Sequence, residues 1–261
     1  MLSTSVISNG QTDEQLMERA YGFFGQDDFK ATIETCDQVI GIDSTNFEAY
    51  ELKANSKKKQ KDFKGASDVY KRMIEIDPAY VFSYINRADM KYFQLNDFAG
   101  ALTDYDKAVS IEPDNTTAFM RRGLAKRAFK DFKGAMEDFS KAIELEPKNF
   151  WAYSERAENK RFAGDFVGAI ADYTTSIGLE PKFWEIYYKR GNVKIDSKDL
   201  AGAIADFDKS LQMRPRNSPV LCGRGVAKIL SGQKEGGCLD LNEAKKLGDK
   251  EADRLIKKYC M

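Results

Sequence analysis

The sequence contains no histidine among its 261 residues. Histidine is the commonest general acid or base near neutral pH and a frequent metal ligand, so its absence removes the usual histidine-assisted nucleophiles and metal sites. Carboxylate or lysine chemistry remains formally open, but nothing in the sequence points to it. We therefore expect a protein that is not an enzyme and that needs no cofactor and no metal.

Long apolar runs are also missing, since no stretch approaches the roughly 18 residues that a membrane span requires. Residues 1–11 are polar and lack the basic segment and apolar core of a signal peptide. We expect a cytoplasmic protein without membrane association and with a flexible N-terminal tail over residues 1–12. The absence of a CxxC pair favours reduced packing residues, with a disulfide or redox role as the alternative, for Cys36, Cys222, Cys238 and Cys260.

Neither sign of charge is in excess, because Lys plus Arg and Asp plus Glu both number 41. General nucleic-acid binders and membrane-surface binders normally carry a basic excess, so we do not expect either function. Charged residues make up 31% of the chain, a level typical of long exposed helices with interleaved charges.

Proline is rare, with six residues, but five of them are separated by 35, 34, 34 and 34 residues: Pro78, Pro113, Pro147, Pro181 and Pro215. Upstream of each lies a Gly-Ala pair, preceded by Asp followed by Phe or Leu, as in Asp131-Phe132 before Gly134-Ala135. Self-similarity at a fixed period indicates a repeat protein. We set seven repeats at residues 13–46, 47–80, 81–115, 116–149, 150–183, 184–217 and 218–251.

Each repeat is expected to form two amphipathic helices joined by a tight turn. In residues 116–149 the first helix carries Phe119 and Gly123 at helical spacing, and Asp131 follows as the N-cap of a second helix. Pro147 ends that helix because proline cannot continue the hydrogen-bond ladder. The third repeat is one residue longer, with the extra residue somewhere in residues 90–96.

Small residues at the eighth position of each repeat predict a close approach of its two helices. They are followed by alanine at the twentieth position and an aromatic residue at the twenty-fourth in most repeats. The eighth-position residues are Ala20, Ala54, Ala88, Gly123, Ala157, Gly191 and Gly225. One hairpin cannot bury this face alone, so neighbouring hairpins must stack.

This pattern of aromatic, Gly or Ala, Ala, aromatic and Pro over 34 residues resembles the tetratricopeptide repeat family over residues 13–251. The resemblance implies an all-α fold: a right-handed superhelical solenoid of seven helical hairpins, whose first helices line a concave groove. Residues 249–261 are expected to add a C-terminal capping helix, because Gly248 can end one helix and Asp249 can cap the next.

Several charges recur with the period of the repeat. Arginine occupies the seventh position at Arg87, Arg122, Arg156, Arg190 and Arg224. Lysine occupies the eleventh position in six repeats, and aspartate the twenty-third position at Asp104, Asp138, Asp172, Asp206 and Asp240. We interpret these charges as a ladder of ion pairs within or between repeats, with a role in ligand binding as the alternative.

In the resembling family, groove residues mostly fall at the second, fifth, sixth, ninth, twelfth and thirteenth positions. The candidate peptide-binding residues are therefore Asn55, Asn86, Arg121, Arg127, Trp151, Arg161, Tyr188, Lys189 and Asn192. Their mixed polar and aromatic character favours a peptide or protein ligand, and so a non-catalytic, monomeric scaffold. The alternative is that they form ordinary solvated helix faces.

Two other functions remain as alternatives. An RNA- or polyanion-associated protein is supported by the lysines of residues 57–61 and opposed by the zero net charge. A co-chaperone-like carboxylate clamp matches the family pattern at Asn55, Asn86 and Arg121. It fails at the two lysine positions, which hold Glu51 and Thr117, and Glu51 would repel a carboxylate.

Overall fold

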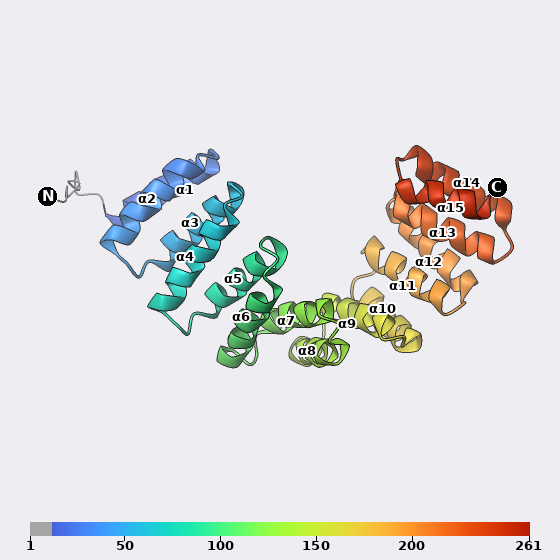
Figure 1. Cartoon of the computed structure of the whole chain (residues 1–261), viewed down its shortest axis with the longest axis horizontal. Coiled ribbons are helices and arrows are strands. Elements are labelled where there is room, and N and C mark those ends of the chain that lie inside the picture. Colours follow the sequence, from blue (N-terminus) through green and yellow to red (C-terminus); the bar gives the residue numbers. More distant parts are fainter. Residues whose placement is uncertain (1–11) are drawn as a thin grey trace. The chain divides into compact units, whose positions relative to one another are not determined.

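The structure is a computed structural model that describes residues 12–261, and all the regular elements in this range are helices. They number fifteen (Figure 1): α1 (Asp13–Gly25), α2 (Phe29–Ile42), α3 (Phe47–Lys59), α4 (Phe63–Ile76), α5 (Val81–Phe93), α6 (Phe98–Ile111), α7 (Thr116–Ala128), α8 (Phe132–Leu145), α9 (Phe150–Phe162), α10 (Phe166–Leu179), α11 (Trp184–Asp196), α12 (Leu200–Met213), α13 (Ser218–Leu230), α14 (Lys234–Lys246) and α15 (Lys250–Tyr259). The predicted all-α fold is confirmed. Of the predicted N-terminal tail, residues 1–11 lie outside the described range, and Thr12 caps α1.

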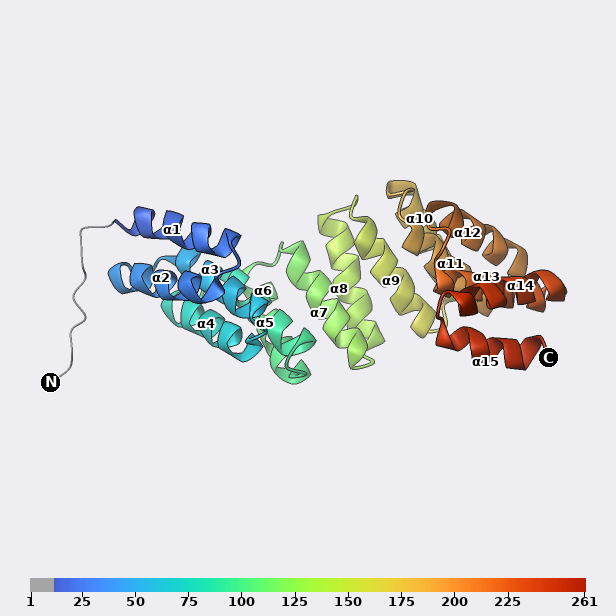
Figure 2. The ribbon, with the colours of Figure 1, turned by 90° about the horizontal axis from the view of Figure 1, so that it is seen from above.

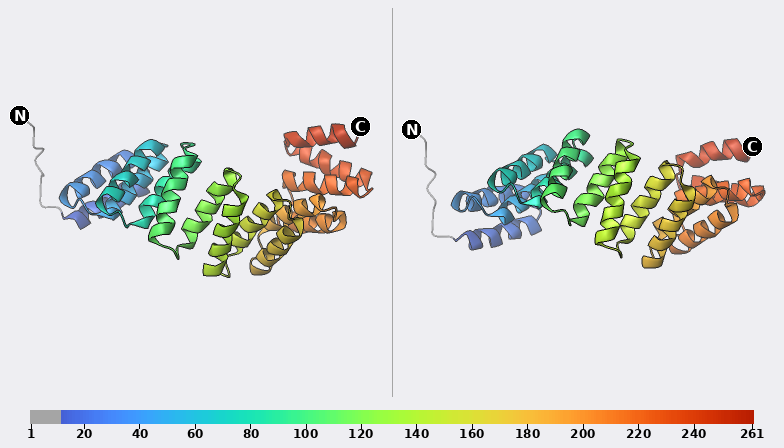
Figure 3. Two further views of the ribbon diagram at one scale, coloured as in Figure 1. Left: turned by 60° about the horizontal axis from the view of Figure 1, so that its bottom comes forward. Right: turned by 90° about the horizontal axis from the view of Figure 1, so that it is seen from below.

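Within each of two units, the helices pack as consecutive antiparallel hairpins of the tetratricopeptide type. Odd-numbered helices contact the following even-numbered ones, as α5 contacts α6 and α9 contacts α10, and hairpins of the same unit pack on one another, as α2 does on α3 (Figure 2). Two compact units result, one ending at Arg121 within α7 and the other beginning at Arg122, and the order of helices within each is visible in Figure 3. The right-handed sense, the number of repeats and their boundaries stay predictions.

The turn inside each hairpin is built by a left-handed residue followed by a helix cap. Lys130 has a φ of 62°, and Gly164 has a φ of 83° at the equivalent place. The next residue is aspartate in six of the seven turns, and the side chain of Asp131 accepts a hydrogen bond from the Gly134 N–H at 2.9 Å, as predicted for an N-cap. A Cβ on Gly134 would lie 2.2 Å from that carboxylate, which explains why glycine recurs there.

The extra residue of the third repeat lies in its turn. Four residues separate Phe93 at the end of α5 from Phe98 at the start of α6, whereas three separate α7 from α8. Asn96 takes the left-handed conformation, with a φ of 56°, and Asp97 still caps α6. The insertion is therefore absorbed without changing the helix cap.

In the five inner repeats, the contact between the helices of a hairpin takes two forms. Where the eighth position is glycine, a phenylalanine lies directly over it: a Cβ on Gly123 would be 2.8 Å from Phe139. Where it is alanine, as at Ala88, the aromatic residue is tyrosine, and the Tyr105 hydroxyl donates to the carboxylate of Asp89 at 2.6 Å. We infer that this hydrogen bond draws the ring towards the ninth position and leaves room for a methyl group at the eighth.

A disulfide joins Cys238 on α14 to Cys260 directly after α15, so the prediction that all four cysteines are reduced is wrong. The pair is 22 residues apart, and it meets only because α15 turns back against α13 and α14. Cys36 and Cys222 are buried thiols, as predicted, and burial raises the pKa of each to about 12. On α15, Ala252 is fully buried against the cluster that contains Cys222.

We predict that Gly191→Ala destabilises the protein by about 1–3 kcal/mol, the usual cost of overpacking a core. Its Cβ would lie 2.8 Å from the Phe207 ring, and that ring cannot withdraw because Gly223 borders its other side equally closely. Thermal or urea unfolding measures the effect, and Phe207→Leu should restore part of the loss. Gly22→Ala is the control: nothing lies near its Cβ, so it should stabilise by about 0.5–1 kcal/mol. Equal behaviour of the two alanine variants would contradict this packing.

We also predict that reduction of the Cys238–Cys260 disulfide loosens α15. Loss of a cross-link of this span costs about 3 kcal/mol through the entropy of the unfolded chain. Alkylation with iodoacetamide under mild reductant should then modify Cys222, which α15 helps to cover, faster than Cys36, which is the internal control at the other end of the chain. If both buried thiols stay equally protected while Cys238 and Cys260 react, α15 does not need the disulfide to stay docked.

Candidate functional site

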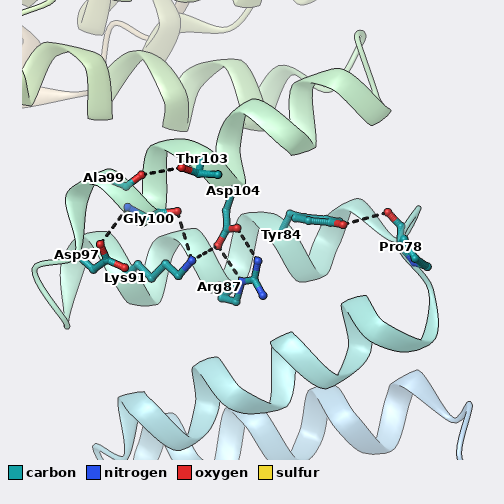
Figure 4. Close-up of polar contacts among 9 residues, drawn as sticks. All are labelled: Pro78, Tyr84, Arg87, Lys91, Asp97, Ala99, Gly100, Thr103 and Asp104. Atoms are coloured by element: carbon teal, nitrogen blue, oxygen red, sulfur yellow. Dashed lines mark hydrogen bonds and ion pairs between the residues drawn. The ribbon is translucent and has the colours of Figure 1, made fainter.

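The recurring charges form a compact ion cluster between the two helices of a hairpin. In the hairpin of α5 and α6, Arg87 donates to both carboxylate oxygens of Asp104, at 2.8 and 2.6 Å (Figure 4). The Lys91 ammonium lies 2.8 Å from the same carboxylate. The Asp104 side chain is only 4% exposed, so two cations hold one nearly buried anion.

The same cluster recurs in four further hairpins, and the predicted ladder of ion pairs is confirmed. Its other members are Arg122–Asp138–Lys126, Arg156–Asp172–Lys160, Arg190–Asp206–Lys194 and Arg224–Asp240–Lys228. Burial alone would raise the pKa of Asp172, but the hydrogen bonds from Arg156 and Lys160 outweigh it and lower the pKa overall. These charges stabilise the fold, and we look for function among the charges that do not recur.

We call the surface formed by the second, fifth, sixth, ninth, twelfth and thirteenth residues of the repeats the first-helix face, because these residues all lie on the odd-numbered helices. In the first unit it carries Asn55 on α3, Asn86 on α5 and Arg121 on α7. A cavity of about 480 Å³ opens on this face, and Asn86 and Arg121 line it but Asn55 does not. The structure thus brings two of these three predicted residues together.

Arg121 has only a loose partner in this cavity. Its Nε lies 3.5 Å from the Asp89 carboxylate, and its guanidinium group rests 5.6 Å from the centre of the Phe93 ring. Asn86 donates its side-chain amide to the carbonyl oxygen of Phe82 at 2.9 Å. Arg121 therefore keeps an exposed guanidinium, with 38% of its side chain accessible.

Asp89 is the most constrained carboxylate of this region. Burial raises its pKa, although the hydrogen bond from Tyr105 and the charges of Arg121 and Lys58 act in the opposite direction. Burial likewise lowers the pKa of Lys58, against the attraction of Asp89 and Glu51. Both groups are thus held in a charged form that their surroundings disfavour, a condition that is frequent at functional sites.

In the second unit the predicted cations are bound within the protein. Arg127 donates to the carboxylate of Glu155 at 2.5 Å and to its carbonyl oxygen at 3.0 Å, and Lys189 lies 3.7 Å from the same carboxylate. Arg161 pairs with Asp196 at 3.0 Å and with Glu158 at 3.3 Å. Glu155, which pairs with Arg127 and Lys189, and Glu158, which pairs with Arg161, therefore bind these cations within the protein.

Aromatic residues provide the exposed apolar part of this unit. Trp151 is 40% exposed, and its ring packs edge-on against Phe183 at 4.7 Å. Tyr188 is less accessible because it packs on Phe207, at 6.1 Å between ring centres. Asn192 is half-buried on α11, one residue after the fully enclosed Gly191.

No group of three or more acidic or cysteine side chains within residues 12–261 is arranged to hold a metal ion. In the same part of the chain, no helix has the length and apolar character needed to cross a membrane.

Comparison with known proteins finds models of tetratricopeptide repeats at several places in this chain. A TPR repeat model matches residues 91–128, one tetratricopeptide repeat model matches residues 155–218, and another matches residues 47–80 and 116–149. Together these segments cover most of the chain between α3 and α12, in agreement with the resemblance that the sequence suggested.

Solved structures with a similar fold include a tetratricopeptide repeat protein from Parabacteroides merdae ATCC 43184, with a TM-score of 0.73 and 23% identity over 97% of this chain and 100% of that one. The type IV pilus biogenesis factor PilW has a TM-score of 0.69 and 15% identity, covering 81% and 98% of the two chains. YrrB, described as a TPR protein with an unusual peptide-binding site, has a TM-score of 0.59 and 20% identity, covering 74% and 99%. At these identities the likeness shows the fold.

We predict that Asp172→Ala destabilises the protein by about 3 kcal/mol, because it leaves Arg156 and Lys160 partly buried without their anion. The control is Asp208→Ala, which removes an exposed carboxylate from Arg224 and should cost at most about 1 kcal/mol. Urea unfolding at neutral pH compares the two. Equal losses would contradict the structural role of the buried cluster.

The lowered pKa of Asp172 fixes the sign of the pH dependence. Its contribution is present above the ordinary carboxyl pKa of about 4 and is lost as the pH falls through the folded-state value. The stability difference between wild type and Asp172→Ala should therefore shrink in acid.

Proposed function

We propose that this chain, which belongs to the tetratricopeptide repeat family, is a non-catalytic scaffold that binds a peptide or protein segment on its first-helix face. The observation that carries the proposal is that its polar residues form two groups, which lie in different places. The recurring charges pair with one another between the two helices of a hairpin. The side chains that remain on the first-helix face do not recur with the period of the repeat. The proposed binding residues are Asn55, Asn86, Arg121, Arg127, Trp151, Arg161, Tyr188, Lys189 and Asn192.

The structure redistributes the roles among these residues. The Arg127 side chain is only 17% exposed and pairs with Glu155 on α9. We therefore propose that Arg127 positions α9 and does not contact a ligand directly. Trp151, which is 40% exposed, is the better contact, and Arg121, with 38% of its side chain exposed, borders the ligand site in the first unit. Tryptophan is also among the residue types that most often dominate interface energy. Among proteins of similar fold, YrrB is described as having a peptide-binding site, which supports this class of ligand.

The two alternative functions have weaker support. A carboxylate clamp would need a cation where Glu51 stands, and Glu51 instead accepts a hydrogen bond from the Tyr80 hydroxyl at 2.6 Å. A polyanion site at residues 57–61 would have to use Lys57, which pairs with Asp62 at 2.8 Å. Steep loss of affinity with added salt would favour the polyanion alternative.

The predicted cytoplasmic location and monomeric state stay proposals. The Cys238–Cys260 disulfide favours an oxidising compartment, because cytoplasmic thiols are normally kept reduced. Trapping thiols in intact cells by alkylation, followed by mass spectrometry, would show which state the pair has there.

We predict that Trp151→Ala weakens partner binding by about 2 kcal/mol, or roughly thirtyfold. The control is Val167→Ala, which truncates an 82% exposed side chain on the second helix of the same hairpin. Each full-length variant, after its melting temperature has been measured, is immobilised and used to capture partners from native cell extract. If Trp151→Ala captures every partner as well as wild type does, the first-helix face of the second unit is not the binding surface.

A further inference from the structure

The cavity in the first unit combines an apolar wall with a lining that is negative overall. Three carboxylates line it, from Asp77, Asp89 and Glu112, against one cation from Arg121. Tyr80, Val81, Phe82 and Ile85 supply its apolar part. Phe82 is 40% exposed and leaves an apolar surface beside the cavity for a ligand to cover.

Arg121 does not neutralise this lining. It offers Asp89 a single contact at 3.5 Å, whereas Arg87 holds Asp104 with two hydrogen bonds of 2.8 Å or less. Its guanidinium group is instead placed over the Phe93 ring. Asp89 is therefore a half-buried carboxylate whose one ion pair, with Arg121, is a single contact at 3.5 Å. Burial raises its pKa although the charges of Arg121 and Lys58 act in the opposite direction. A second cation brought to Asp89 would stabilise its charged form.

The neighbouring part of the same face has the same sign. A second cavity, of about 690 Å³, lies between α1 and α3 and is lined by Asp13, Glu14, Glu18 and Glu48, with no lysine or arginine. Glu48 accepts a hydrogen bond from the Tyr21 hydroxyl at 2.7 Å. Both cavities are lined by first-helix residues of one unit, and each lining has more carboxylates than cations. Lys58 on α3 is a cation of the same face that interacts with Asp89.

We propose that the cavity of the first unit binds a lysine or arginine side chain of a peptide partner. Asp89 is its counter-ion, Glu112 adds charge at the exposed side, and Phe82 and Ile85 contact an apolar residue next to the basic one. The inference rests on the proposed scaffold function and names the chemistry of the ligand. The partner is thus a basic polypeptide segment, and a polyanion is repelled from this face.

Substitutions of neighbouring residues are expected to change the affinity for a basic peptide in opposite directions. Asp89→Asn should weaken binding of a basic peptide by about tenfold or more, since it removes a half-buried counter-charge but keeps an acceptor for the Tyr105 hydroxyl. Glu112→Gln, at an exposed position, should weaken it by about two- to fivefold. Arg121→Gln should strengthen it, because Arg121 competes for Asp89.

The probe is a displayed library of random peptides selected on the full-length protein, and the best binders are then measured by fluorescence anisotropy. We expect lysine or arginine beside an aliphatic or aromatic residue in the selected peptides. Glu75→Gln is the matched control, because it removes an exposed carboxylate of the same unit from the second helix of a hairpin. It should leave the affinity unchanged, and melting curves confirm that every variant is folded.

The inference would be overturned if the selected peptides had no excess of basic residues. It would also be overturned if Asp89→Asn and Glu112→Gln did not change the affinity for these peptides. In either case the scaffold function would stand, because peptides would still bind. Heparin binding that Arg121→Gln weakens would also overturn it, in favour of a polyanion. If no peptide is recovered and Trp151→Ala loses no partner, both the inference and the proposed function fail.

Discussion

Within each hairpin, the two helices meet at a point where neither has room for a large side chain. Ala157 and Ala169 are completely buried at one such contact, and Tyr173 fills the space beside them. A helix pair held this closely leaves its outer faces uncovered, so stability depends on the next hairpin. The turn follows from the same requirement, since a left-handed residue and an aspartate cap reverse the chain in three residues in five of the seven hairpins.

The close approach also explains where the recurring charges lie. Arginine and lysine on the first helix reach across the contact to an aspartate on the second, and their long side chains cover its edge. A single pair of this kind on the surface would contribute little, but the carboxylate of Asp138 is 3% exposed and is held by two cations. The recurring charges of a repeat thus form ion pairs with one another. Under the proposed function, recognition falls to the side chains that differ from repeat to repeat.

Those side chains behave differently in the two units. In the second unit Glu155 binds both Arg127 and Lys189, and the remaining exposed group is aromatic, at Trp151. In the first unit Asp89 accepts a hydrogen bond from Tyr105 and has a single contact with the Arg121 guanidinium, at 3.5 Å, and the lining of its cavity has more carboxylates than cations. One fold therefore presents two surfaces of different chemistry, an aromatic and internally neutralised one and an acidic one.

The sequence by itself determined the fold class, the position of the helices, the Asp131 cap and the ladder from Arg87 to Asp240. These features recur every 34 residues or so, and each depends on neighbours within one hairpin, which periodicity reveals. Tertiary structure alone decided which cations are available to a ligand: Arg127 pairs with Glu155 at 2.5 Å, whereas Arg121 contacts Asp89 at 3.5 Å and stays more exposed. It also decided the Cys238–Cys260 bond, because two unremarkable cysteines meet only when α15 folds back on α14. Contacts between residues far apart in the chain leave no periodic trace, and the binding chemistry of this protein depends on such contacts.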